Sequence, residues 1–391
     1  MLKKVKICFV INSMVGGGAE RVSSLLIREL SKNDNFNISL CLLEKSDLYY
    51  ELPTDIKISY LGQNNFNDNN IKKVIGLYSQ SNMLREIIKK DNIDLIFSFL
   101  GRANYVSILA SNKTNSKVII SERAMTSESY PKGYNLKSMI NRYLISSLYP
   151  KADYITPNAK LIKYDLVKNF MIPKDKIEVI YNPFDLKQID KIEKTNQLDQ
   201  FQKPIIVNVG SLHERKNQEL LILAFARSNI DGTLLIFGEG NEKNKLEDLI
   251  VRLELTKRVY LMGHKKDIFS YLKSADLFVL SSKREGFPNV IVEAMACGLP
   301  IVSTDCKSGP REILAPDSDE VYFLKDDIEY SKYGVLVPEN NIELLAQGIK
   351  KICDNTLLDK YKSKSLERAK NFDKSIIIEQ YVKLIYKTLG R

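Results

Sequence analysis

Two glutamates eight residues apart, Glu285 and Glu293, have the side chains best placed in this sequence to contact a polar ligand. An apolar run over 275–280 precedes them and predicts a buried parallel strand. Pro288 then marks the start of a predicted helix over 289–297, whose free N-terminal amides suit an anion such as a diphosphate. Carboxylates beside an anion site are better suited to accept hydrogen bonds from hydroxyl groups. A sugar nucleotide carries both groups, although two solvated glutamates on an ordinary strand–turn–helix would have the same pattern.

Two glycine-rich turns between predicted strands and helices also have the residue types of an anion site. The first, 15–21, contains three glycines that let the backbone approach a ligand closely. It is not GxGxxG, so a nicotinamide or flavin site is not favoured. The second, 209–217, places Arg215 and Lys216 side by side after a predicted strand. Because the carboxyl ends of parallel strands form the ligand edge of a sheet, this pair is well placed to bind an anion, although two adjacent cations at such a turn would also fit a solvated surface pair.

The spacing of Glu285 and Glu293 resembles the E-x7-E signature of retaining glycosyltransferases with the GT-B fold, in particular family 4 (glycosyl transferases group 1). The first glycine turn is similar to the family's GGxE/R loop, and the second to its glycine followed by an Arg-Lys pair. Residues 308–314 resemble an SGPxEI segment common in members that build surface polysaccharides, O-antigen and lipid-linked glycans. The resemblance covers nearly the whole chain. It implies an α/β fold with two doubly wound parallel-sheet, Rossmann-like domains facing across a cleft, and a C-terminal helix crossing back to the first domain.

The resemblance also implies roles for individual residues. Glu285 would hold hydroxyls of the transferred sugar, and Glu293 those of the ribose. Arg215 and Lys216 would join Glu285 as catalytic residues by stabilising the departing diphosphate. The loop that contains His264 would meet the nucleotide base through its backbone, and the histidine itself is equally well explained as a capping or surface residue. The donor-binding set is Gly17, Gly18, Gly210, Arg215, Lys216, Gly263, His264, Glu285, Phe287, Pro288, Asn289, Val290 and Glu293.

Three residues of the first half are assigned to the acceptor: Glu20, Arg21 and Arg123. Many family members have a histidine after the Ser-Glu pair at 121–122, where this chain has Arg123. This difference leaves the role of Arg123 open between a sugar hydroxyl, a donor phosphate and an acceptor phosphate. A buried structural ion pair is an equal alternative.

The elements that must position these residues alternate between strand and helix in both halves, which predicts two doubly wound sheets. Residues 1–182 and the helix 375–391 are expected to form the acceptor-binding domain, and 183–374 the nucleotide-sugar domain. The polar segment 62–70 predicts a surface loop. Strands are expected at 6–11, 38–43, 94–100, 117–121, 154–156, 177–180, 204–209, 233–237, 259–262, 275–280, 300–303 and 334–337, and helices at 19–30, 71–90, 136–148, 218–228, 243–255, 289–297 and 375–389.

The positive charge is concentrated in the first half. Residues 1–182 hold 26 Lys or Arg against 17 Asp or Glu, and the remainder holds 32 against 31, within a net charge of +10. Nucleic acid and anionic lipid both attract a basic surface, and the membrane is preferred because the chain has no nucleic-acid-binding motif. A basic face that serves only solubility is the remaining alternative. No apolar run reaches the length of a membrane span. We therefore expect a cytoplasmic protein, peripheral on the inner face of the plasma membrane, that binds no nucleic acid.

Neither a metal nor a cofactor is expected. The five cysteines are scattered without metal-ligand spacing and fit reduced thiols in the cytosol, and only two histidines are present.

The expected reaction is retaining, metal-independent transfer of a hexose or N-acetylhexosamine from a nucleotide diphosphate sugar, most often a UDP-sugar. The expected acceptor is a glycan carried by polyprenyl diphosphate, in surface polysaccharide or glycoconjugate biosynthesis. A glycoside hydrolase is one alternative, because it also uses two carboxylates, although it needs no anion site. A basic, non-enzymatic nucleic-acid-binding module is the other.

Overall fold

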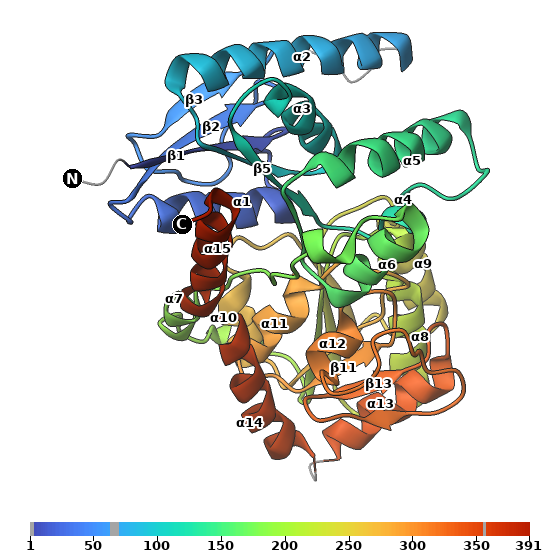
Figure 1. The fold of residues 1–391 in the computed structure, drawn as a ribbon. Helices are drawn as coiled ribbons and strands as arrows, with labels where there is room; N and C mark the ends of the chain where they lie inside the picture. Colours follow the sequence, from blue (N-terminus) through green and yellow to red (C-terminus); the bar gives the residue numbers. More distant parts are fainter. Residues whose placement is uncertain (1–3, 63–69, 355–356) are drawn as a thin grey trace. The chain divides into compact units, whose positions relative to one another are not determined.

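The computed structural model describes residues 4–62, 70–354 and 357–391 (Figure 1). The chain forms two compact units: unit 1 is Met1–Pro183 with Ser375–Arg391, and unit 2 is Phe184–Lys374. The first boundary lies one residue after the expected one. Most of the expected surface loop, residues 63–69, lies outside the described residues.

Unit 1 contains a six-stranded parallel sheet with the strand order β3-β2-β1-β4-β5-β6. The order reverses between β1 and β4, which makes this a doubly wound sheet with its ligand edge at the carboxyl ends of the strands. Its strands and α-helices are β1 (Val5–Ile11), α1 (Gly18–Leu30), β2 (Phe36–Leu42), β3 (Lys57–Tyr60), α2 (Asn70–Asp91), β4 (Leu95–Phe99), α3 (Gly101–Ser111), β5 (Lys117–Glu122), α4 (Thr126–Ser129), α5 (Leu136–Leu148), β6 (Tyr154–Pro157), α6 (Lys160–Phe170) and α15 (Lys374–Leu389).

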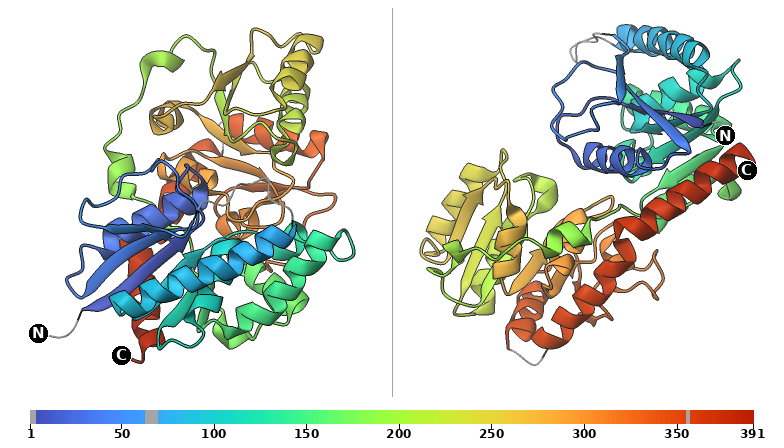
Figure 2. Two further views of the ribbon diagram at one scale, coloured as in Figure 1. Left: turned by 90° about the horizontal axis from the view of Figure 1, so that it is seen from above. Right: turned by 90° about the vertical axis from the view of Figure 1, so that its left-hand side faces the viewer.

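Helices bury both faces of this sheet, as the nearly continuous apolar strands predict. Alternate residues of β1 face opposite sides: Cys8 and Val10 belong to the core beneath α2, α3, α5 and α6, whereas Ile7 and Phe9 belong to the core beneath α1 and α15. Tyr381 of α15 packs against Phe97 with the ring centroids 5.5 Å apart. The C-terminal helix therefore returns to the first domain, as the resemblance implied, and lies beside the unit 1 strands in both views of Figure 2.

Unit 2 contains a seven-stranded sheet with the order β12-β13-β11-β10-β7-β8-β9, parallel except for the edge strand β12. Here the order reverses between β7 and β10. Its strands and α-helices are α7 (Leu186–Asp190), β7 (Ile205–Val209), α8 (Gln218–Ser228), β8 (Thr233–Phe237), α9 (Lys243–Arg252), β9 (Val259–Gly263), α10 (Ile268–Ser274), β10 (Leu277–Leu280), α11 (Asn289–Ala296), β11 (Ile301–Thr304), α12 (Pro310–Leu314), β12 (Glu329–Tyr330), β13 (Val335–Val337), α13 (Ile342–Cys353) and α14 (Leu358–Ala369). Short 3₁₀ turns lie at Tyr149–Lys151, Lys174–Lys176, Asn196–Leu198, Glu214–Lys216 and Lys370–Phe372.

Several expected elements need correction. The strand at 177–180 is wrong, because this segment forms only an isolated bridge from Ile177 to Ile155 of β6. The helix expected to reach residue 255 ends at Arg252, shortly before Glu254 adopts a left-handed φ of 57°. The elements that the sequence patterns missed include β3, α3, α6 and α10 (Ile268–Ser274). The edge strand β3 is half-exposed and lacks an apolar run, and α3 is buried on most sides and so has no polar face to give it a helical period.

Within the described ranges, no helix combines the length and hydropathy that a membrane span would require.

Candidate active site

Two turns of unit 2 are joined at the point where its strand order reverses. The turn after β7 contains Arg215 and Lys216, and the turn after β10 contains Ser281 and Lys283. The backbone N–H of Lys283 donates to the carbonyl of Arg215 (2.9 Å), and the Ser281 hydroxyl donates to the carbonyl of Lys216 (3.0 Å). These bonds place the predicted cations next to the carboxylate loop at the ligand edge of the sheet.

Lys216 and Glu285 form an ion pair at this edge. Lys216 Nζ lies 2.6 Å from Glu285 Oε1, and the two side chains are only 14% and 7% exposed. The Ser282 hydroxyl donates to the same carboxylate oxygen at 2.6 Å. The stem of Lys216 crosses Gly210, where a β-carbon would be in contact with it. The sequence predicted both residues for the site but not that they bind each other.

The loop that carries Glu285 is held by the segment after β11. The backbone N–H of Glu285 donates to the carbonyl of Lys307 (2.5 Å), and the backbone N–H of Ser308 donates to the carbonyl of Glu285 (3.0 Å). Gly309 has a φ of 97°, and any side chain there would collide with the ring of Pro288. The SGPxEI-like segment therefore fixes the position of the carboxylate loop, which its sequence did not predict.

Helix α11 begins at the expected residue and ends at Ala296, one residue earlier than expected. Pro288 is its N-cap and Asn289 its first residue, so the proline ring still occupies a position where no N–H is needed. Glu293 lies one turn inside the helix and is buried. Phe287 is also buried, and its ring packs against Phe372 at 5.6 Å between centroids, so this side chain contributes to the core of unit 2.

The other predicted donor residues of unit 2 lie on neighbouring turns. Arg215 is exposed, as is the side chain of His264 after β9. Gly263 has a φ of 67°, and its carbonyl accepts a hydrogen bond from the backbone N–H of Gly238 after β8 (3.0 Å). Backbone bonding between the β8 and β9 turns gives this loop a defined shape, which a base contact through the main chain would require.

Arg311 forms a buried structural cluster behind the carboxylate loop. Its Nε donates to Asp305 Oδ1 (3.0 Å) and its Nη1 to Glu329 Oε2 (3.0 Å). Burial raises the pKa of Asp305, although the hydrogen bonds from Arg311 oppose that shift. Burial also raises the pKa of the adjacent Cys306 thiol, and the negative charge of Glu285 adds to the increase. This thiol is therefore poorly nucleophilic.

The predicted glycine-loop residues belong to unit 1 and lie at the start of α1. Gly17 is the N-cap, Gly18 is the first helical residue, and Glu20 is the third residue of the helix. Glu20 is buried, and its carboxylate lies so close to Gly17 that a side chain at position 17 would collide with it. Acidic residues stabilise this position of a helix, so Glu20 has a structural role at the start of α1. Arg21 follows it and is half-buried.

Arg123 lies at the carboxyl end of β5 and joins α15 to the sheet of unit 1. Its Nη1 donates to Asn182 Oδ1 (2.5 Å) and its Nη2 to the hydroxyl of Tyr381 (3.1 Å). The guanidinium also lies 5.1 Å from the centre of the Phe99 ring. Both of these partners are neutral, so among the described residues these contacts hold Arg123 in the structure without forming an ion pair. Its Nε is buried without a hydrogen-bond partner.

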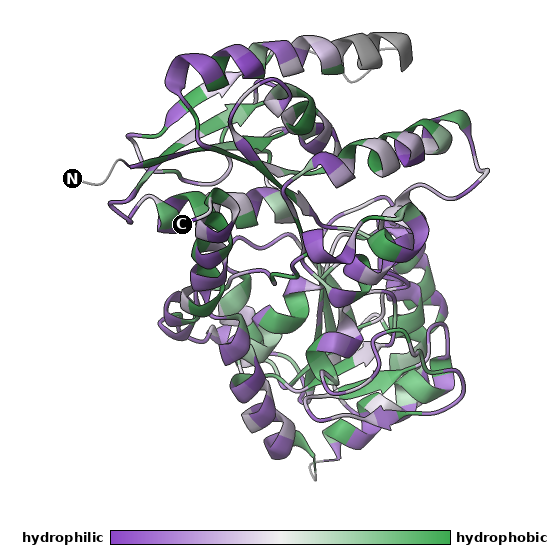
Figure 3. Cartoon of the chain, viewed as in Figure 1, coloured by the Kyte–Doolittle hydropathy of each residue, from purple (hydrophilic) through white to green (hydrophobic). Residues whose placement is uncertain are grey.

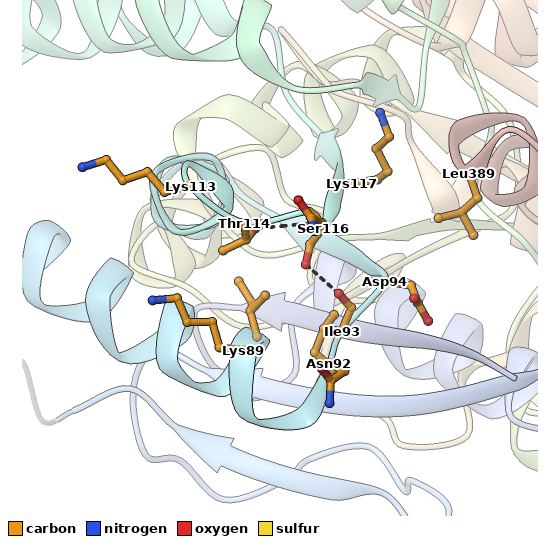
Figure 4. Close-up of a pocket in the computed structure, with 11 residues that line it drawn as sticks. Lys89, Asn92, Ile93, Asp94, Lys113, Thr114, Ser116, Lys117 and Leu389 are labelled. Carbon is orange, nitrogen blue, oxygen red and sulfur yellow. Dashed lines mark hydrogen bonds between the residues drawn. The ribbon is translucent and has the colours of Figure 1, made fainter. Parts of the chain in front are cut away.

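A pocket of about 560 Å³ opens in unit 1, at the end of the sheet opposite the carboxyl ends of its strands (Figure 4). Asp94 and Ser116, which line it, immediately precede β4 and β5. It therefore lies at the amino ends of the strands, whereas the predicted ligand residues of unit 1 follow the carboxyl ends. Across the part of the chain that the structure describes, His, Cys, Asp and Glu side chains form no group of three that could hold a metal ion.

Comparisons with known proteins identify the family in both halves of the chain. The family model described as Glycosyltransferase Family 4 matches residues 16–188, and the model described as Glycosyl transferases group 1 matches residues 190–372.

Two relatives come from Campylobacter jejuni. The N-acetylgalactosamine-N,N'-diacetylbacillosaminyl-diphospho-undecaprenol 4-alpha-N-acetylgalactosaminyltransferase is 36% identical over 97% of this chain and 99% of its own. The GalNAc-alpha-(1->4)-GalNAc-alpha-(1->3)-diNAcBac-PP-undecaprenol alpha-1,4-N-acetyl-D-galactosaminyltransferase is 24% identical over 97% and 98% of the two chains.

Among solved structures, Anabaena HepE in complex with UDP has the same fold, with a TM-score of 0.78 and 20% identity over 98% of this chain and 100% of its own. These matches favour a transferase over the glycoside hydrolase and the nucleic-acid-binding module. The chain belongs to glycosyltransferase family 4, the glycosyl transferases group 1, and has the GT-B fold.

Proposed function

We propose that this glycosyltransferase transfers a hexose or N-acetylhexosamine, with retention of configuration and without a metal, from a UDP-sugar to a glycan carried by polyprenyl diphosphate. The names of the two Campylobacter relatives support N-acetylgalactosamine as the first sugar to test and an undecaprenyl-diphosphate-linked glycan as the acceptor class. The complex of Anabaena HepE with UDP supports uridine as the base. The protein would act at the inner face of the plasma membrane, where such an acceptor is exposed to the cytoplasm.

The observation that carries this proposal is the ion pair between Lys216 and Glu285. A largely buried cation and carboxylate at the ligand edge of a sheet match the two ends of a sugar diphosphate. The ammonium suits the diphosphate and the carboxylate suits the sugar hydroxyls. The N-terminus of α11 adds backbone N–H groups directed toward the same loop. We assign donor binding to this edge of unit 2 and acceptor binding to Glu20, Arg21 and Arg123 of unit 1.

The proposed chemistry balances without a cofactor. The bond between the anomeric carbon and the diphosphate oxygen breaks, and its electron pair remains on that oxygen. Lys216, Arg215 and the α11 amides stabilise the negative charge that develops there. The acceptor hydroxyl forms the new bond from the side that the diphosphate leaves, and its proton passes to a phosphate oxygen. Glu285 orients the sugar during this exchange, and Glu293 holds the ribose.

The direct test supplies the purified protein with a panel of UDP-sugars and a short-chain polyprenyl-diphosphate disaccharide. We expect UDP release and an extended glycan with at least one N-acetylhexosamine donor, and an α-anomeric product from the α-linked donor. A β-linked product would contradict retention. Transfer only from a donor with another base would contradict the proposed nucleotide.

Turnover is expected to survive a metal chelator. The positive groups of unit 2, Arg215, Lys216 and the start of α11, would neutralise the diphosphate in place of a divalent ion. Initial rates with excess EDTA should equal those of untreated enzyme, and added magnesium should not raise them. A loss of activity that magnesium or manganese restores would show that a metal takes part.

A further inference from the structure

Helix α5 of unit 1 and Tyr134, which precedes its N-cap, present large apolar side chains to solvent. Tyr134, Leu136, Met139 and Tyr143 are 75%, 64%, 58% and 71% exposed, and we call these four residues the α5 patch. Leu136, Met139 and Tyr143 are spaced by three and four residues, so they lie on one side of the helix. Figure 3 shows hydrophobic and hydrophilic residues alternating along α5. Single exposed apolar residues are common, but four within ten positions form a surface that indicates a partner.

The helix is built so that this row stays exposed. Asn135 caps it by accepting a hydrogen bond from the backbone N–H of Ser138 (2.8 Å). Among the residues of α5, only Ser138, Ile145 and Leu148 are buried, so its first two turns contribute little to the core. Asn141 accepts a hydrogen bond from the hydroxyl of Tyr105 on α3 (3.2 Å), which fixes how the helix is rotated. The fold therefore holds the α5 patch outward without using its side chains for packing.

The segment that runs from the α5 patch through α6 is strongly basic. Residues 132–171 contain seven Lys or Arg and two Asp, a charge of +5 out of +10 for the whole chain. Neither acid offsets the basic surface: Asp165 is buried, and Asp153 pairs with Lys117 at 3.0 Å. Lys132 and Lys137 are exposed beside the α5 patch. Met171 is 82% exposed. It lies two residues after Asn169, whose carbonyl accepts a hydrogen bond from Arg142 of α5.

We propose that the α5 patch docks unit 1 on an anionic lipid bilayer. A helix that lies at the surface of a bilayer typically combines tyrosine, leucine and methionine with lysine. Its aromatic rings and aliphatic side chains enter the boundary between headgroups and acyl chains, while the lysine ammonium groups reach the lipid phosphates. The charge of this region matches an anionic surface, and that match selects lipid over a second copy of the same basic chain. This inference rests on the proposed function for its purpose, which is to bring unit 1 to a lipid-linked acceptor.

Vesicle flotation tests the proposal on the full chain. The test variant is Leu136→Gln with Tyr143→Gln, and the matched control is Val251→Gln with Tyr330→Gln, whose native side chains are 64% and 48% exposed in unit 2. With vesicles of phosphatidylcholine and phosphatidylglycerol, the test variant should partition roughly tenfold less than wild type, because two apolar anchors are lost. The control should partition like wild type. Equal partitioning of the test variant would overturn the proposal.

The charge contribution is measured separately. Lys132→Gln with Lys137→Gln should lower partitioning to the anionic vesicles by about fivefold for each lysine, and wild type should bind vesicles of phosphatidylcholine alone much more weakly. Unchanged partitioning of this variant would overturn the role of the anionic headgroups. If wild type ignored vesicles but formed a dimer that the Leu136→Gln, Tyr143→Gln variant lost, the occupant would be a second copy, and the proposal would be wrong.

Activity distinguishes this inference from the proposed function. The Leu136→Gln, Tyr143→Gln variant should extend a water-soluble, short-chain acceptor at the wild-type rate and lose rate only with a long-chain acceptor in vesicles. Flotation requires no catalysis. A protein that bound vesicles through α5 but transferred no sugar would contradict the proposed function and leave the docking surface standing.

Discussion

Replacing Lys216 with methionine is expected to reduce turnover by roughly tenfold to a thousandfold, the effect of removing one fixed charge from a developing oxyanion. Lys216 is also the partner of Glu285 at 2.6 Å, so the same change leaves a largely buried carboxylate unpaired. Breaking such a pair from one side costs roughly 3–5 kcal/mol of folding free energy. We therefore expect two separable losses, one in turnover and one in the free energy of unfolding of unit 2.

The double variant Lys216→Met, Glu285→Gln separates these two losses. It removes both charges, so much of the stability should return in thermal unfolding, while turnover should stay at or below that of the single variant. Lys283→Met is the matched control, because Lys283 pairs at 3.0 Å with Glu214, whose side chain is 81% exposed. Because that pair is exposed to solvent, breaking it should change stability little. Full turnover in the double variant would remove both residues from the mechanism.

Replacing Arg311 with methionine is expected to destabilise unit 2 by roughly 3–5 kcal/mol without any direct contact to substrate. The side chain of Arg311 is 4% exposed and that of Asp305 is not exposed at all, so the remaining carboxylate would be buried without its cation. Calorimetry is the suitable measurement, because it can resolve separate unfolding of the two units. The second variant, Arg311→Met with Asp305→Asn, should recover part of the loss.

The loss in the Arg311→Met variant should depend on pH in a defined direction. Burial already raises the pKa of Asp305 in the folded protein, and removing Arg311 should raise it further. A carboxyl group whose pKa is higher in the folded than in the unfolded protein stabilises the fold at low pH. This stabilisation is fully present below the unfolded pKa, near 3.9, and is lost as the pH rises through the folded pKa. The difference from wild type should therefore be largest near neutral pH and shrink on acidification. A difference that is constant with pH would show that Asp305 is not its source.

Much of the site could be predicted because its signals are local. Gly210 and Pro288 mark turns by their own backbone preferences, and the apolar run before Glu285 predicts a parallel strand from adjacent residues alone. The turn after β7 and the start of α11 were recognised for this reason. The missed helix α3 shows the limit, because a helix buried on most sides lacks the periodic polar face that such reasoning needs.

Only the tertiary structure decided which of these residues meet. Lys216 and Glu285 are 69 positions apart, and they pair because β7 and β10 are neighbours in the sheet. Arg123 and Tyr381 are separated by 258 positions and bond because α15 returns to unit 1. The sequence by itself determined the turns, the periodic strands and the residue types of the site. Strand order and the return of the last helix determined their partners, because contacts between distant segments depend on packing free energy summed over the whole sheet rather than on any local preference.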